Sequence, residues 1–305
     1  MTTTYDASVI KQKLTRKRRT KVEMAELQDA LFESLEADNP QTVRQVFYQM
    51  ANREHPLVEK NQSGYNTVQR LLVKMRKNKV IPYDWISDGT RWVRKPTTYD
   101  SMSEALEDTI LTYRRSVWAD QHVHVEFWEE KDALAGVIYQ ETYKWDVPLY
   151  VSRGFSSDSY LWEAAQQLAA QRKPCFVYIL TDYDEQGFTI ARKIEEGLRR
   201  HAPDADITVN RLALTKDQIK EWNLPTRMAK DSSVKKGFDK QAVDLDAIPA
   251  WQLRQIVREK IESHIDAERY ERLMTEEKLE RETLKRMMRV FTGDETEDET
   301  EDETE

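Results

Sequence analysis

The stretch CFVYILTDYDEQG, Cys175–Gly187, decides the fold class of this chain. Its first six residues form an unbroken apolar run, which is typical of a strand buried on both faces of a parallel sheet. Asp182 and Asp184 follow where the run ends and a helix-like segment begins. Because ligands in open α/β sheets bind at the carboxyl ends of strands, this stretch predicts a strand that brings two carboxylates to a binding edge.

The surrounding sequence repeats this pattern of strand and helix. Alternation of this kind predicts a mostly parallel sheet with helices on both faces. The lone cysteine, Cys175, falls within an apolar run, which predicts a buried, inert thiol and a reducing cytoplasm. The expected strands span residues 122–128, 147–152, 175–180 and 207–214, and the expected helices span 131–144, 158–171 and 185–200.

The N-terminal part has a different order of elements. Helical patterns reaching residue 36, and then at 41–53 and 65–78, precede a hairpin-like segment at 80–95 with an Asp88-Gly89 turn. Three helices and a hairpin are the element order of a winged-helix module. The expected fold is therefore α/β plus α+β. We divide the chain into a basic helical extension (1–37), a winged-helix domain (38–98), an α/β domain (99–248), a charged helical region (249–292) and an acidic tail (293–305).

The charge is unevenly distributed. The net charge is −8, but the final twelve residues, DETE three times, hold nine of the 55 acidic residues and no base. Residues 1–100 carry 18 Lys and Arg against 12 Asp and Glu, which favours a nucleic-acid partner. No run of about 18 apolar residues predicts a membrane span, and the polar N-terminus does not resemble a secretory signal. We therefore expect a cytoplasmic protein with a disordered tail.

Basic residues lie on one side of the third expected helix. Arg70, Lys74 and Lys77 form a stripe nearly opposite its apolar face, and the hairpin adds Arg91 and Arg94. A basic helix beside a basic hairpin predicts contacts with the phosphates of duplex DNA. A solvated charged face remains the alternative.

Carboxylates also follow the first expected strand. Glu130 lies at the same predicted sheet edge as Asp182 and Asp184, and three carboxylates form an oxygen-rich site suited to Mg²⁺. The register leaves Glu129 as an alternative to Glu130. A calcium-binding EF-hand is excluded because Lys193 stands where its loop requires a glutamate.

The second expected helix carries a tyrosine outside its apolar stripe. Tyr48 lies one turn from Arg44 on the flanking face. An arginine at that spacing can stabilise a phenolate and bind a phosphate oxygen. A surface tyrosine that packs its ring over a neighbour is the alternative.

Two motifs together resemble one protein family. Thr42-Val-Arg-Gln-Val-Phe-Tyr48 is similar to the T-x-R-x-[IV]-[YF]-Y motif of the type IIB topoisomerase A subunit (topoisomerase VI) and the meiotic double-strand-break transesterase. Glu130-Lys-Asp132 and the stretch Asp182–Gly187 resemble the E-K-[DE] and D-x-D-x-x-G of their Toprim domain. The resemblance spans about residues 40–215, and the short chain most resembles the compact Mini-A proteins of phages and plasmids. Phe47 stands where relatives often have a second tyrosine.

The resemblance implies a chemistry. Tyr48 would attack a DNA phosphodiester and form a 5′-phosphotyrosyl link, assisted by Arg44. Glu130, Asp182 and Asp184 would hold Mg²⁺, and a homodimer would cut both strands of nucleoid DNA. No ATPase signature occurs, so coupling to ATP would need a separate subunit, and Val243–Ala247, which resembles downstream parts of the family, receives no chemical role. The alternatives are a Toprim nuclease without a covalent intermediate and a non-catalytic DNA-binding protein, with a Toprim primase as a weaker one.

Overall fold

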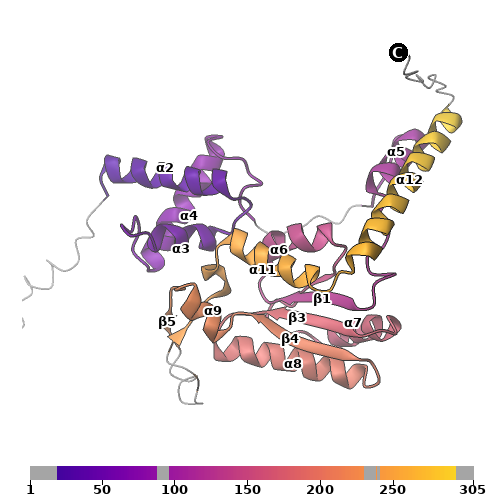
Figure 1. The fold of residues 1–305 in the computed structure, drawn as a ribbon. Coiled ribbons are helices and arrows are strands. Elements are labelled where there is room, and N and C mark those ends of the chain that lie inside the picture. The colour runs from indigo at the N-terminus through magenta and orange to yellow at the C-terminus, as the bar shows by residue number, and fades with distance from the viewer. Residues whose placement is uncertain (1–18, 88–95, 230–237, 239–240, 293–305) are drawn as a thin grey trace, which may run out of the picture. The chain divides into compact units, whose positions relative to one another are not determined.

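A computed structural model describes residues 19–87, 96–229, 238 and 241–292 (Figure 1). The chain divides into two compact units, Met1–Ser87 and Asp88–Glu305. Among the described residues, no helix is both long and apolar enough to cross a membrane.

The first unit is built around three helices: α2 (Lys21–Ala37), α3 (Val43–Ala51) and α4 (Gln62–Lys77). Each of the three begins at a residue whose side chain accepts a hydrogen bond from a backbone N–H of the first turn. In α3 this residue is Thr42, which forms a reciprocal capping box with Gln45. Apolar side chains from all three helices, among them Leu31, Val46 and Leu72, form one buried core. The three predicted helices are confirmed, with ends that differ by a few residues.

Only residues 80–87 of the predicted hairpin lie within the described residues, and they form no strand. Residues 80–87 form turns and a single isolated bridge between Gln41 and Ile86. The Asp88-Gly89 turn, Arg91 and Arg94 lie outside the described residues. The winged helix therefore stays a prediction.

The second unit contains the predicted sheet. Its strands are β1 (His124–Glu129), β2 (Leu149–Val151), β3 (Cys175–Leu180) and β4 (Ile207–Ala213). Within the described part of the chain these four strands pair in the order β2-β1-β3-β4, and every pairing is parallel. The alternating pattern therefore gave a correct prediction of the α/β class and of the parallel sheet.

Helices cover both faces of this sheet. Figure 1 shows α6 (Asp132–Lys144) and α11 (Ala250–Glu262) on one face, with α7 (Asp158–Ala170) and α8 (Glu185–His201) on the other. Trp128, Val177 and Ile179 belong to the buried cluster on the α7–α8 side, where the predicted burial of Cys175 is confirmed. Short elements follow β4: α9 (Lys216–Glu221), β5 (Arg227–Met228), β6 (Gln241–Ala242) and the 3-10 helix η1 (Leu245–Ala247).

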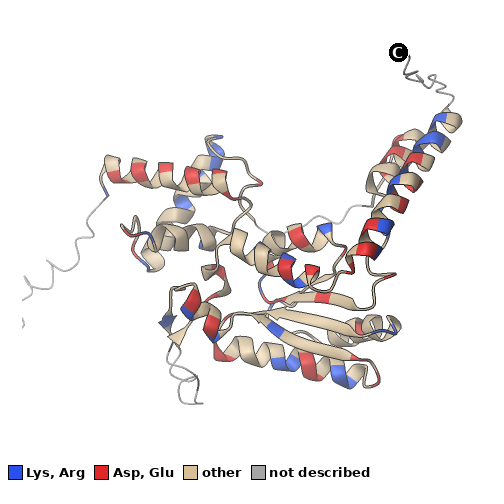
Figure 2. Ribbon diagram, viewed as in Figure 1, with Lys and Arg blue, Asp and Glu red and all other residues tan. Residues whose placement is uncertain are grey.

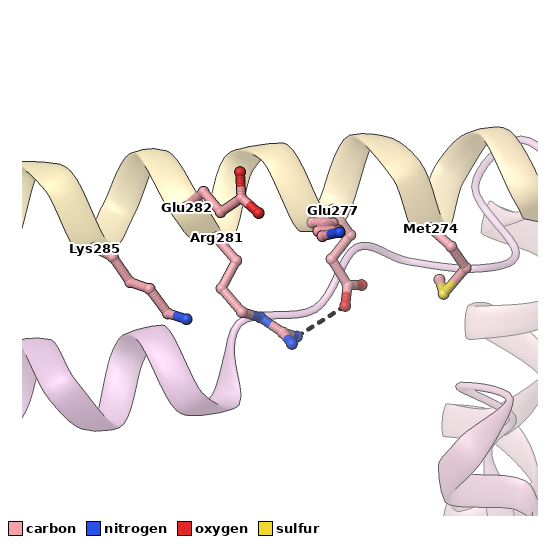
Figure 3. A pocket seen from close by; sticks show the side chains of 6 residues that line it. Met274, Glu277, Arg281, Glu282 and Lys285 are labelled. Atoms are coloured by element: carbon pink, nitrogen blue, oxygen red, sulfur yellow. Dashed lines mark hydrogen bonds and ion pairs between the residues drawn. The ribbon is translucent and has the colours of Figure 1, made fainter. Parts of the chain in front are cut away.

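Two further helices, α5 (Met102–Thr112) and α12 (Ala267–Thr292), pack together and extend from the sheet as an arm (Figure 1). Ion pairs connect α12 to the segment that follows α5 at the base of the arm. Arg115 pairs with Glu276 and also lies 3.5 Å from Glu280. Arg281 pairs with Glu277 at 2.8 Å beside a cavity of about 270 Å³ on α12 (Figure 3). The sequence predicted one helical region here, whereas the structure has two helices, α11 and α12.

Candidate metal and catalytic site

The candidate site lies where the direction of the sheet reverses. The chain passes from β1 to β2 on one side of β1 and then returns to β3 on its other side. Glu129 and Leu180 form the last residue pair between β1 and β3, so Glu130 and Asp182 both follow the ends of adjacent strands. Such a reversal point is where open α/β sheets bind ligands.

Asp182 is held by a cation and by the backbone. Its Oδ1 atom lies 2.8 Å from the Lys131 ammonium and accepts a hydrogen bond of 2.7 Å from the Leu245 backbone N–H. Burial raises the pKa of the Asp182 carboxyl, and both contacts oppose that rise because they stabilise the carboxylate. Asp182 is therefore anchored through its Oδ1 atom.

Asp184 begins α8 and at the same time contacts an arginine. Its Oδ1 accepts a hydrogen bond of 2.8 Å from the Gly187 N–H, and its Oδ2 lies 2.8 Å from Arg227. The backbone of α8 approaches that of Asp182 closely here: a Cβ on Gly187 would lie 2.2 Å from the Asp182 carbonyl oxygen. The D-x-D-x-x-G spacing thus has a local cause. Asp184 caps α8 by accepting a hydrogen bond from the backbone N–H three residues later, and only glycine fits at that position, Gly187.

Glu130 is half-buried and lacks a full set of partners. Its Oε2 atom is buried with no hydrogen-bond partner among the described residues. Burial raises the pKa of Glu130 to about 7, and the negative charges of Asp182 and Asp184 add to the rise. A divalent cation would relieve this repulsion, and carboxylate oxygens are the ligands that Mg²⁺ prefers. The chemical type of these three donors therefore suits such an ion.

Glu129, the alternative ligand, has different surroundings. Its side chain is fully buried, and neither carboxylate oxygen has a hydrogen-bond partner among the described residues. Burial raises its pKa far above the usual range, with a further contribution from Asp246. Glu130, rather than Glu129, is the glutamate whose pKa responds to Asp182 and Asp184, and this favours Glu130 as the ligand.

The site contains acidic residues to which sequence reasoning gave no role. Lys131 lies 2.8 Å from Asp246 Oδ2 as well as from Asp182. Arg227 bridges Asp184 and Asp244, with its Nε atom 2.9 Å from Asp244 Oδ1. Residues 243–247 therefore close over the strand ends. A second D-x-D in the sequence was the available signal.

Arg211, on β4, was also missed. Its guanidinium donates hydrogen bonds to the Asp182 carbonyl at 2.6 Å and to Thr181 Oγ1 at 2.9 Å. Burial lowers the pKa of Arg211 to about 10, although Tyr183 and Asp182 oppose the shift. Arg211 thus fixes the backbone that carries the two aspartates, and nothing in its sequence context indicates this.

The three predicted carboxylates approach one another without forming a finished ligand set. In the part of the chain that the structure describes, no three carboxylate, imidazole or thiol side chains converge as metal ligands. Asp182 is instead paired with Lys131, and Asp184 is paired with Arg227. Binding an ion would require these carboxylates to share or exchange their cationic partners.

The predicted nucleophile lies in the first unit, on α3. Tyr48 is half-buried, with its ring 5.3 Å from that of Phe47, and the ammonium of Lys60 lies 5.9 Å from the centre of the Tyr48 ring. Arg44 is exposed, and its guanidinium lies 5.6 Å from the centre of the Tyr65 ring. Two cationic side chains thus surround this part of α3.

The basic stripe on α4 faces solvent. Arg70, Lys74 and Lys77 are exposed, while Leu72 and Met75 on the opposite side are buried. The stripe is therefore available to a polyanion.

Comparison with known proteins adds no family. No protein-family model matches the chain, and no curated protein matches it. Any resemblance to type IIB topoisomerases therefore depends on the two sequence motifs alone.

Proposed function

We propose that this chain is a magnesium-dependent DNA transesterase of the type IIB topoisomerase kind, which cleaves duplex DNA through a 5′-phosphotyrosyl intermediate. The observation that carries the proposal is the carboxylate edge formed by Glu130, Asp182 and Asp184 at the reversal point of a parallel sheet. The α3 motif with Arg44 and Tyr48 supports it independently.

The reaction begins at the Tyr48 hydroxyl. Its oxygen bonds to a DNA phosphorus, the bond from phosphorus to the 3′ oxygen breaks, and the phenolic proton passes to water while the 3′ oxygen gains a proton. The phosphotyrosyl ester conserves the energy of the broken bond, so the strand can be resealed. Arg44 and Lys60 would stabilise the charge on the phosphate and bind it next to the tyrosine.

Glu130, Asp182 and Asp184 would hold the magnesium ion. When bound, Mg²⁺ neutralises charge on the phosphate. Lys131 and Arg227 orient the two aspartates through ion pairs of 2.8 Å, and Arg211 fixes the backbone that carries Asp182.

The substrate is duplex DNA, bound along Arg70, Lys74 and Lys77. We propose a homodimer in which the tyrosine of one copy acts at the metal site of the other, an arrangement taken from the resembling family. Coupling to ATP would require a separate ATPase subunit. In a cell the protein would act in the cytoplasm, on nucleoid or mobile-element DNA.

A metal-dependent Toprim nuclease is the second candidate. The half-buried ring of Tyr48, packed on Phe47, favours it, because such packing suits a structural tyrosine. Water rather than Tyr48 would then attack the phosphorus at the carboxylate edge.

Incubation with supercoiled plasmid and Mg²⁺ separates these candidates. The products are run on gels with and without protease digestion after denaturation. A transesterase gives cleaved DNA that enters the gel as linear or nicked product only after protease treatment. Products that are identical with and without protease would favour the nuclease.

A further inference from the structure

The arm of α5 and α12 carries an apolar surface that the rest of the chain leaves uncovered in the described residues. Met287, Val290 and Phe291, near the distal end of α12, are 63%, 80% and 60% exposed, and Leu279 near the middle of this helix is 57% exposed. Solvent-exposed apolar patches of this kind mark interaction surfaces.

Helical periodicity places Leu279, Met287 and Val290 in one stripe, and Phe291, about five turns after the buried Leu273, lies at the edge of this stripe nearest to α5. Leu273 and Glu277 are the buried residues of α12, and Arg281 donates to the Tyr113 carbonyl, so this side of α12 faces α5 and its C-terminal extension. At 3.6 residues per turn, Arg286 and Arg289 lie on the opposite flank of the stripe. The stripe is therefore bordered by α5 on one side and by arginines on the other.

The charges on the two borders are opposite. α5 carries Glu104, Glu107 and Asp108 and no Lys or Arg, whereas residues 284–292 of α12 carry three basic residues and no acid (Figure 2). Ion pairs occur at the base of the arm, where Arg115 and Arg281 contact acidic residues of α12. Among the described residues, Glu107, Arg286 and Arg289 have no ion-pair partner.

We propose that this surface docks a second copy of the chain, so that two arms pair into a four-helix bundle. When the two copies are related by a two-fold axis parallel to α12, the stripes bury each other, and α5 of each copy lies against the arginine flank of its partner's α12. Duplex DNA or an anionic membrane fits less well, because the acids of α5 repel both. The acidic tail would pair with the arginines but would leave the apolar side chains in water.

Sedimentation velocity of the full chain over a range of concentrations tests the proposal. Met287→Ser with Val290→Ser should raise the dissociation constant of the dimer by about tenfold or more, since both side chains would be central to the interface. Val22→Ser with Met228→Ser is the matched control, because each of these side chains is 77% exposed outside the arm. A chain that remains monomeric at tens of micromolar, or equal effects of the two variants, would overturn the proposal.

A charge exchange tests the predicted pairing itself. Arg286→Glu with Arg289→Glu makes both borders acidic, and Glu104→Arg with Glu107→Arg makes both basic, so each variant alone should associate weakly. An equimolar mixture should form the heterodimer, in which both contacts are again attractive. A mixture that associates no better than either variant alone contradicts the arrangement.

Two further measurements test whether the acidic tail or DNA, rather than a second copy of the chain, binds this surface. Removal of residues 293–305 should leave association unchanged, and a dimer that appears only after this removal would assign the surface to the tail. A loss of DNA affinity in the double arginine variant, with unchanged self-association, would assign the surface to DNA instead. Both results would overturn the proposal. This inference does not depend on DNA cleavage.

Discussion

The Lys131 ammonium lies 2.8 Å from Asp182 Oδ1. This ion pair connects the segment that follows β1 with the first aspartate after β3. The same ammonium lies 2.8 Å from Asp246, so one cation serves two nearly buried carboxylates from different parts of the chain. Burial alone would lower the pKa of Lys131, but Asp246 and Asp182 outweigh it and raise the pKa. Lys131 is therefore charged throughout the neutral pH range.

Lys131→Met should destabilise the chain by about 2–3 kcal/mol, because two carboxylates would stay buried without their shared cation. Thermal or urea unfolding at neutral pH measures this loss. Lys131→Arg keeps the charge and should recover most of the stability. Lys144→Met is the control, since Lys144 is exposed and its partner Glu141 keeps a second cation, Arg258, so that this loss should cost less than about 1 kcal/mol. Equal effects of Lys131→Met and Lys144→Met would contradict the role given to Lys131.

Glu130→Gln should stabilise the chain above pH 7 in the absence of divalent ions. The pKa of Glu130 is about 7 in the folded chain and near the usual glutamate value when unfolded, so its contribution to stability is complete at low pH and is lost as the pH rises through 7. Removal of this charge should raise the free energy of unfolding by about 1–2 kcal/mol at pH 8, after allowance for solvent screening at a half-buried side chain. Unfolding of both proteins at pH 5 and pH 8 in EDTA measures it. A difference between them that does not grow with pH would show that Glu130 is not strained by its neighbours.

Asp182→Ala and Glu130→Ala should each abolish Mg²⁺-dependent cleavage, because the remaining carboxylates would hold the ion poorly. Asp158→Ala is a suitable control, since Asp158 is an exposed carboxylate of α7 outside both motifs and pairs with Arg200. Cleavage and Mg²⁺ binding by calorimetry are both measured, so that loss of the ion is distinguished from loss of chemistry. If Glu129→Ala is inactive and Glu130→Ala is active, the metal ligand is Glu129 and not Glu130.

The parts of this site that could be predicted are those set by local sequence. The apolar run of β3 and the capping aspartate of α8 are adjacent in the chain, and parallel strands bring their carboxyl ends to one edge, so Asp182, Asp184 and Glu130 followed from pattern and topology. Asp246 and Arg227 could not be placed in this way. Their position depends on how the chain after β4 folds back over the sheet, and no periodicity in the sequence encodes that return.

Replacement of Arg70, Lys74 and Lys77 together by Gln should weaken binding to duplex DNA and reduce its salt dependence. Each lost phosphate contact should lower the slope of log affinity against log salt by about 0.9. A matched triple replacement of Arg192, Arg199 and Arg200 removes the same charge from α8, where each arginine already pairs with an acid. Equal slopes for the two triple variants would show that the α4 stripe does not contact DNA.

The central claim is that Tyr48 forms a covalent bond with the 5′ end of a broken strand, and end-labelled duplex DNA tests it most directly. The DNA is incubated with wild-type protein and Mg²⁺, and the reaction is then denatured. Protein should remain attached to the fragments that carry a 3′ label, whereas the 5′-labelled fragments should end in a free 3′ hydroxyl. Tyr48→Phe should bind DNA nearly as well, because the ring and its packing on Phe47 remain, and should form no adduct. An adduct or unchanged cleavage in Tyr48→Phe would contradict the account.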